Sequence, residues 1–256
     1  MVLASDAAHA QFTLGARSLA MGQTGVALPD DPWALYANPS LIETDNNRVS
    51  FYGFRYLGIS DISDFAVAAN TQTRFGTIAG GIHRFGFDLF NESRFRVAYK
   101  NSADRFHYGG ALTYTHVNQG GGFGSAGAFG LDVGIAAEVI DGLWFGARST
   151  NINQPTFGST DEQLPRESAI GISYRLSSLA LFTTEIVKDV RFPISYRGGV
   201  EIELVESLFA RAGVTTEPET YSFGFGYATS RILINVGVQQ HVPLGLSPAL
   251  DLGINF

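Results

Sequence analysis

In residues 47–256, large apolar residues occur at every second position and alternate with small or polar ones. In residues 221–228, for example, four aromatic residues alternate with Ser, Gly, Gly and Ala. The final stretch, 247–256, follows the same pattern. Because successive side chains of a β-strand point to opposite faces, sustained alternation of this kind predicts strands and argues against long helices.

The alternation predicts fourteen strands, which limits the fold class. They lie near residues 47–56, 62–73, 76–87, 92–101, 105–118, 127–140, 143–152, 167–177, 179–188, 194–204, 208–215, 220–229, 231–241 and 247–256. A tilted strand that crosses a bilayer needs ~9–11 residues, which most of these stretches provide. Tight turns alternate with longer connections such as 88–91, 154–166 and 216–219. We therefore predict an all-β fold, a 14-stranded antiparallel transmembrane β-barrel over residues 47–256.

The charged residues indicate which face of each strand points outward. Only 16% of the residues are charged, against about 25% in a typical globular domain. Within the strands they mostly share the face that carries small residues, and a Lys or Arg in contact with lipid near the midplane costs roughly 2–4 kcal/mol. We predict that the large apolar residues contact lipid and that the charges face the lumen. The predicted lumen charge network comprises Glu138, Arg148, Arg175, Glu185, Arg197, Glu201, Arg211 and Asp251.

The residues before the first strand fall into two parts. Residues 1–10 end in an A-x-A pattern typical of a signal-peptidase site, and they are interpreted as the remnant of a signal peptide or as a disordered N-terminus. Residues 11–46 combine many turn-forming residues with scattered large apolar ones such as Trp33. Because a barrel of fourteen strands is too wide to be filled by its own side chains, residues 11–46 are predicted to form a plug, or hatch, inside the lumen.

The segment 14–42 has the sequence LGARSLAMGQTGVALPDDPWALYANPSLI, which resembles the N-terminal hatch of the FadL-type outer-membrane β-barrels. Within that superfamily it is most similar to the PorV/PorQ group. The resemblance implies an integral protein of the bacterial outer membrane. The residues assigned to the hatch motif are Arg17, Asp31, Trp33, Asn38, Pro39 and Ser40. The terminal Phe256, in phase with the apolar face of the last strand, resembles the signal that the barrel assembly machinery recognises.

The resemblance implies two functions. The first is an accessory, partner-binding subunit of a type IX-like protein secretion system, which would bind a larger secretion-system or surface protein; short extracellular loops favour it. The alternative is a FadL-like channel for the passage of hydrophobic small molecules, with a hydrophobic ligand or lipid in the lumen. A third hypothesis is a structural barrel that anchors a partner. The inward charges either line a substrate path or form ion pairs that hold the plug, and the cost of an unpaired buried charge favours ion pairs.

Several other functions are not indicated. The net charge is −7 and the basic residues are scattered, which argues against nucleic-acid binding. The chain has no Cys and no pair of histidines at metal-binding spacing, so no metal is expected. The G-x-G-x-x-G pattern at residues 122–127 precedes a strand and not a helix, so no dinucleotide cofactor is expected. No nucleophile elbow is present, so we predict no catalytic residues and no enzyme activity.

Overall fold

The structure of the protein, a computed structural model, describes residues 14–56, 62–121, 124–158, 162–177, 179–241 and 245–256. The predicted signal-peptide remnant at 1–10 lies outside the described residues, as do residues 11–13 of the predicted plug. From residue 14 onward the chain consists of an N-terminal segment followed by a continuous series of strands.

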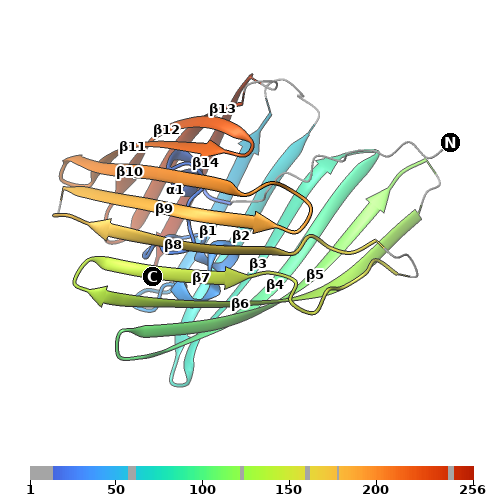
Figure 1. The fold of residues 1–256 in the computed structure, drawn as a ribbon, viewed down its shortest axis with the longest axis horizontal. Helices are drawn as coiled ribbons and strands as arrows, with labels where there is room; N and C mark the ends of the chain where they lie inside the picture. The colour runs from blue at the N-terminus through green and yellow to red at the C-terminus, as the bar shows by residue number, and fades with distance from the viewer. Residues whose placement is uncertain (1–13, 57–61, 122–123, 159–161, 178, 242–244) are drawn as a thin grey trace.

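Within these residues, fourteen antiparallel strands pair in sequence order, and β1 pairs with β14 to close a barrel (Figure 1). The strands are β1 (Arg48–Arg55), β2 (Ser63–Thr73), β3 (Gly76–Phe87), β4 (Phe90–Ala103), β5 (Phe106–Gln119), β6 (Gly124–Ile140), β7 (Leu143–Ser149), β8 (Glu167–Arg175), β9 (Ala180–Asp189), β10 (Ser195–Val205), β11 (Leu208–Thr216), β12 (Glu219–Ala228), β13 (Ile232–His241) and β14 (Gly245–Asn255). The predicted fold class is confirmed. The largest differences from the predicted bounds are at β6, which begins at 124 instead of 127, and at β7, which ends at 149 instead of 152.

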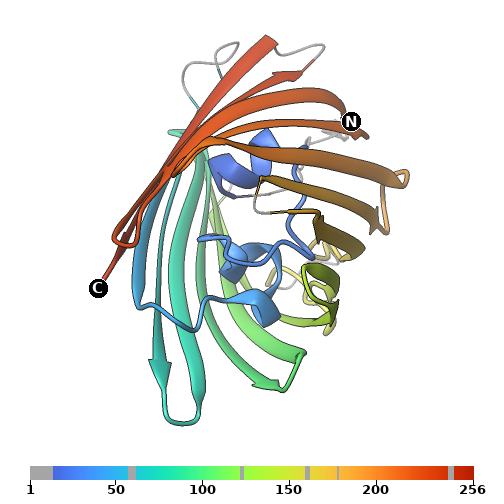
Figure 2. The same cartoon turned by 90° about the vertical axis from the view of Figure 1, so that its left-hand side faces the viewer.

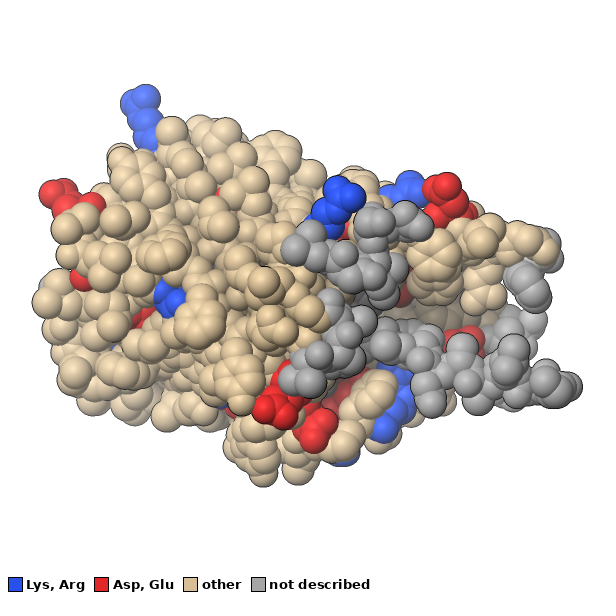
Figure 3. Space-filling model, turned by 90° about the horizontal axis from the view of Figure 1, so that it is seen from above, with Lys and Arg blue, Asp and Glu red and all other residues tan. Residues whose placement is uncertain are grey.

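The strands place large apolar side chains outside the barrel and small or polar ones inside. On β12, Phe223 and Phe225 are 63% and 60% exposed, whereas Ser222 is fully buried. On β14 the outward Leu250 is 48% exposed and the inward Asp251 only 1%. A broad area of the outer surface accordingly carries few charged side chains (Figure 3). An apolar outer face and a polar interior are the distribution typical of a transmembrane barrel.

Two connections are shorter than the sequence predicts. Residues 88–91 and 216–219 are expected to be longer loops, but two residues join the strands at each place. Pairing continues into the predicted loops, and Phe87 pairs with Phe90 next to the first of these turns. The predicted difference in length between the connections at the two ends of the barrel is therefore wrong at these places. The longest connection joins β7 to β8 and spans residues 150–166.

Residues 14–46, which we call the inner segment, lie inside the ring of strands (Figure 2). They contain two short α-helices, α1 (Ala16–Ala20) and α2 (Ala34–Ala37), and a 3-10 helix, η1 (Pro39–Leu41). Frequent prolines and glycines keep these helices short. No helix among the described residues is long and apolar enough to cross a membrane. Trp33 is fully buried and belongs to the apolar core between the inner segment and the wall.

Candidate functional site

The main ion-pair contact between the inner segment and the wall is centred on Glu201 of β10. Arg17 of α1 forms a bidentate pair with this carboxylate, with Nε–Oε2 and Nη2–Oε1 distances of 2.9 Å. Arg211 of β11 donates from Nε to Glu201 Oε2 at 2.6 Å. The three side chains are at most 8% exposed. Two buried guanidinium groups therefore share one carboxylate, so each of these buried charges has a partner, as burial requires.

The polar chain continues from Arg211 around the wall and returns to the inner segment. Arg211 Nη1 donates to Asn235 Oδ1 at 2.8 Å, and Asn235 Nδ2 donates to Asp251 Oδ1 at 2.6 Å. The other oxygen of Asp251 accepts from the backbone N–H of Ala16 at 2.7 Å. Both ends of this network contact α1, so strands β10, β11, β13 and β14 together hold the start of the inner segment.

A second pair of charges holds the middle of the inner segment. Glu185 Oε2 of β9 accepts from the backbone N–H groups of Gly25 and Val26, at 2.8 and 2.9 Å. Arg197 Nη1 of β10 donates to Gln23 O at 2.9 Å. The same Nη1 lies 3.7 Å from Glu185 Oε1, in a pair whose side chains are at most 2% exposed. These two side chains therefore bind the backbone of the inner segment as well as each other.

The Asn38-Pro39-Ser40 triplet binds the inner segment to itself and to β6. Asn38 Nδ2 donates to Val26 O at 2.6 Å and to Ile135 O at 3.2 Å. Asn38 Oδ1 accepts from the Ser40 backbone N–H at 3.1 Å and from the Ser40 hydroxyl at 2.8 Å, which caps η1. Pro39 occupies the first turn of η1, where its missing N–H is not needed. These contacts are those of a turn that fixes the path of the chain.

Asp31 and Trp33 form a local turn, and Arg148 contacts the segment further along. Asp31 Oδ1 accepts from the Trp33 N–H at 2.7 Å. Burial raises the pKa of the Asp31 carboxyl above its usual range, an effect that the nearby Arg17 guanidinium partly offsets. Arg148 of β7 pairs with Glu167 and donates from Nη1 to Tyr36 O at 3.3 Å. Arg148 thus binds the inner segment through a backbone carbonyl.

Two members of the predicted charge network lie apart from these contacts. Glu138 Oε1 accepts from the Gly142 N–H at 2.9 Å, at the tight turn between β6 and β7. Arg175 lies at the end of β8 beside the same turn, and its backbone N–H donates to Gly142 O. Phe256 follows β14 and is 75% exposed. The odd or even position of a residue along its strand, which we call its parity, correctly places Asn235 on the inner face. The predicted charge network omitted Asn235 because this residue carries no charge.

Glycines of the inner wall lie where the backbone of the inner segment approaches the strands. A Cβ added to Gly199 of β10 would lie 2.6 Å from Met21 Cβ, and one added to Gly213 of β11 would come closer than 3.0 Å to Gly22 N. Gly146 of β7 makes a third contact of this kind with the segment's backbone. Real Cβ atoms essentially never come so close. Only glycine at these positions allows the inner segment to lie directly against the wall.

We expect Gly199→Ala to destabilise the folded barrel by about 1–3 kcal/mol, because the added methyl group overpacks the contact with Met21. Gly198 is a matched control, since its Cβ would point outward and meet its nearest neighbour, Thr183 O, only at 3.8 Å. Denaturant unfolding in detergent measures the stability of the Gly199→Ala variant and of the corresponding Gly198→Ala variant. Equal stability of the two variants would show that the inner segment does not lie against Gly199.

Aromatic rings of β1 and β3 also face the lumen. Trp33 of the inner segment contacts Tyr52 of β1 edge to face, with ring centroids 5.5 Å apart. Further along the inner face, Phe54 contacts Tyr56 at 4.6 Å, and Tyr56 contacts Phe85 of β3 at 6.2 Å. We call these five residues the aromatic wall. It runs from the inner segment toward the end of β1 that leads to β2.

The described residues contain no group of three or more His, Asp or Glu side chains that could hold a metal ion. No protein-family model matches the chain, and no curated protein matches it. Solved structures do match it along almost its full length, and they include two toluene transporters and a FadL homologue.

Three of these structures illustrate the likeness. The toluene transporter TbuX of Ralstonia pickettii matches with a TM-score of 0.72 at 14% identity, covering 94% of this chain and 98% of that chain. The P. putida toluene transporter TodX matches with a TM-score of 0.73 at 12% identity and the same coverage. A Pseudomonas aeruginosa FadL homologue matches with a TM-score of 0.64 at 10% identity, covering 96% of this chain and 98% of that chain. At such identities the likeness shows a common fold.

Proposed function

We propose that this chain is an outer-membrane channel through which small hydrophobic molecules pass, with the inner segment closing the barrel to ions. The aromatic wall is the observation that carries the proposal. Most of the inner face is built from glycine, alanine, hydroxyl and charged residues, so a group of five aromatic side chains is unusual there. Aromatic rings offer a hydrophobic solute large apolar surfaces at little entropic cost, and polar solutes gain nothing from them.

The outer surface and the comparisons support the same function. Large apolar residues of strands around the barrel point outward and are about half exposed, for example Phe65, Ile82, Leu112 and Phe225. This band suits the hydrocarbon of a bilayer. Two of the structural neighbours are toluene transporters and a third is a monoaromatic hydrocarbon channel. By analogy, we infer an aromatic or other compact apolar solute for this chain, because flat aromatic rings make up the aromatic wall.

The two tryptophans provide a test, because both lie on the inside of the barrel. In a Trp144→Phe background, Trp33 is the single tryptophan and lies in the aromatic wall. We expect bromobenzene to quench its fluorescence saturably, whereas iodide, a charged quencher, leaves it unchanged. Absence of saturable quenching by bromobenzene, or equal quenching by iodide, contradicts the proposal.

The same assay tests the role of the wall itself. Tyr52→Leu is expected to weaken bromobenzene binding by about tenfold or less, since one aromatic contact contributes ~0.5–1.5 kcal/mol. Phe51→Leu on the same strand is the matched control, because Phe51 points outward and is 46% exposed. Equal affinities for the two variants would place the ligand elsewhere.

A second candidate function is the accessory, partner-binding subunit of a type IX-like secretion system. It is supported by the hatch-like sequence of residues 14–42 and by the two-residue connections at 88–89 and 217–218, which are too short to form a capture site. Purification from native membranes distinguishes the two. A stoichiometric large protein partner without bound hydrophobic solute favours the accessory subunit, and the reverse result favours the channel.

A further inference from the structure

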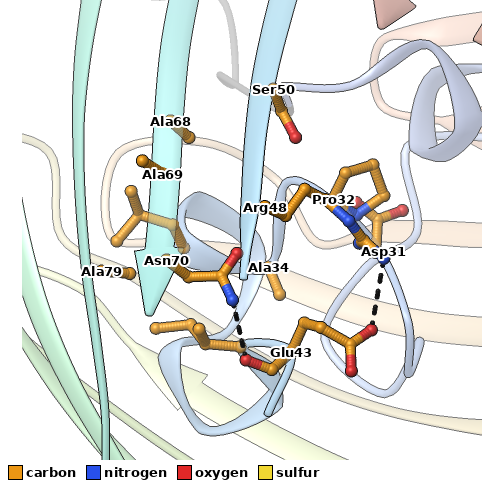
Figure 4. A pocket seen from close by; sticks show the side chains of 12 residues that line it. Asp31, Pro32, Ala34, Glu43, Arg48, Ser50, Ala68, Ala69, Asn70 and Ala79 are labelled. Atoms are coloured by element: carbon orange, nitrogen blue, oxygen red, sulfur yellow. Dashed lines mark hydrogen bonds and ion pairs between the residues drawn. The ribbon is translucent and has the colours of Figure 1, made fainter. Parts of the chain in front are cut away.

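The pocket between the inner segment and strands β1 and β2 leaves no room for an organic ligand, since its volume is about 10 Å³ (Figure 4). At this pocket, Arg48 Nη2 donates to Glu43 Oε2 at 3.3 Å, and Asn70 Nδ2 donates to Glu43 O at 3.0 Å. These contacts attach the inner segment to the wall. The outer surface of the barrel differs, because it carries polar side chains that neither the inner segment nor the aromatic wall uses.

Four neighbouring strands, β3 to β6, carry a row of outward polar or small residues next to a row of large apolar ones. We call the first the polar row and the second the apolar row, and within each row every residue lies directly opposite the next. The polar row is Arg84, Ser93, His116 and Gly127, and the apolar row is Ile82, Phe95, Tyr114 and Phe129. Ile82, Phe95 and Phe129 are 49%, 48% and 58% exposed. Because residues two apart in a strand share a face, both rows point outward.

The polar row marks one edge of the apolar outer band. On β5 the outward positions from 106 to 114 hold Phe, Tyr, Gly, Leu and Tyr, and His116 follows them. This length matches the ~9–11 residues with which a tilted strand crosses the hydrocarbon. The Tyr114 ring lies 4.8 Å from that of Phe129, and its hydroxyl lies over Gly127, where an added Cβ would come closer than 3.0 Å. A ring on the apolar side and a hydroxyl on the polar side suit the edge of a membrane.

The polar row carries an unpaired positive charge. Arg84 is exposed, and none of the described residues forms an ion pair or hydrogen bond with its side chain. The next outward row, nearer the strand ends, is uncharged and consists of Gly86, Asn91, Asn118 and Ser125. The nearby Glu92 is buried on the inner face and pairs with Arg94. A guanidinium at the edge of a lipid band attracts an anion, and phosphate is an anion that Arg binds in a bidentate manner.

We propose that the polar row binds the phosphate group of a lipid in the leaflet at the barrel end away from Phe256. Directly opposite residues have Cβ atoms ~4.5–5.5 Å apart, so Arg84, Ser93 and His116 can donate to one phosphate from three adjacent strands. The acyl chains of the same lipid pack on the apolar row. A lipid is selected over a soluble anion because only a lipid uses both rows. The inference requires that the outer face contacts lipid, and it is independent of which solute passes the barrel.

Lipid titration of the full chain in an uncharged, phosphate-free detergent tests the proposal, with native mass spectrometry counting the bound lipid. The probe is dioleoyl phosphatidic acid, and dioleoylglycerol is the same lipid without the phosphate. Arg84→Gln should weaken binding of phosphatidic acid about tenfold, because it removes a charge-assisted contact. Arg231→Gln is the matched control, since Arg231 is also exposed but lies in the turn between β12 and β13. It should bind the probe as the unaltered chain does.

Equal affinities of the two Gln variants, or equal binding of dioleoylglycerol and phosphatidic acid, overturn the proposal, since the lipid would then adhere through apolar surface alone. Glycerol phosphate carries the phosphate without acyl chains. If it displaces phosphatidic acid at equal concentration, the row binds a soluble anion and the proposal fails.

Two further variants test whether the row acts together. His116→Phe keeps a ring beside Tyr114, on which His116 stacks, but loses the N–H groups. Ser93→Ala loses the hydroxyl. Each should weaken binding of phosphatidic acid about threefold, the effect of one neutral hydrogen bond. Unchanged binding in both variants overturns the assignment of a site formed by three strands.

Discussion

Glu201→Gln should lower the free energy of unfolding by about 3–5 kcal/mol, the loss expected when one partner of a buried ion pair is removed. The amide keeps the size of the side chain but leaves Arg17 and Arg211 as two buried cations without a carboxylate between them. Urea unfolding followed by tryptophan fluorescence measures the change.

Glu203→Gln on the same strand is the matched control. Glu203 accepts from the Ser207 N–H beside a turn and is only partly buried, so its loss should be small. The double variant Arg17→Gln/Glu201→Gln should recover part of the stability, because it removes one of the two unpaired cations. If Glu201→Gln is no more destabilising than Glu203→Gln, the ion pairs do not hold the inner segment.

Phe225→Arg is expected to have the second large effect. Phe225 points outward from the middle of β12 and is 60% exposed. An arginine there would lie in hydrocarbon, at a cost of roughly 2–4 kcal/mol near the midplane. Assembly in native membranes, followed by the heat-modifiable mobility of the folded barrel, measures the loss. Phe225→Leu should assemble normally, and normal assembly of Phe225→Arg would mean that this face does not contact lipid.

The sequence was sufficient to predict the barrel, because strand alternation follows directly from the geometry of the extended chain. Phe223 and Phe225 alternate with small residues that face the lumen, and no tertiary information is needed to separate the two faces. The same parity identifies Glu201 and Arg211 as inward. It does not show that Arg17 and Arg211 share the Glu201 carboxylate, because Arg17 comes from a segment 184 residues away from Glu201.

Other features depend on close contacts between the inner segment and the wall. The alternating pattern of the sequence carries no information about such contacts. Parity places Gly224 in the lumen, but only the structure shows that a Cβ there would lie 2.6 Å from Ala20 Cβ. Glu138 and Arg175 have lumen parity, yet they lie at a tight turn, away from the inner segment. The inner segment itself has no periodic face, so its short helices and its contacts with β9–β14 could not be derived from the pattern of its residues.

The central claim is that the inner segment excludes ions while a hydrophobic solute passes, and vesicles that contain the purified protein test it most directly. The measurement follows transfer of a hydrophobic aromatic solute and leakage of a small inorganic ion in the same preparation. The account predicts that the intact protein accelerates solute transfer without ion leakage, and that a variant lacking residues 11–46 leaks ions because an unfilled barrel of this width is open. Equal ion leakage from both proteins, or no solute transfer by the intact one, would contradict it.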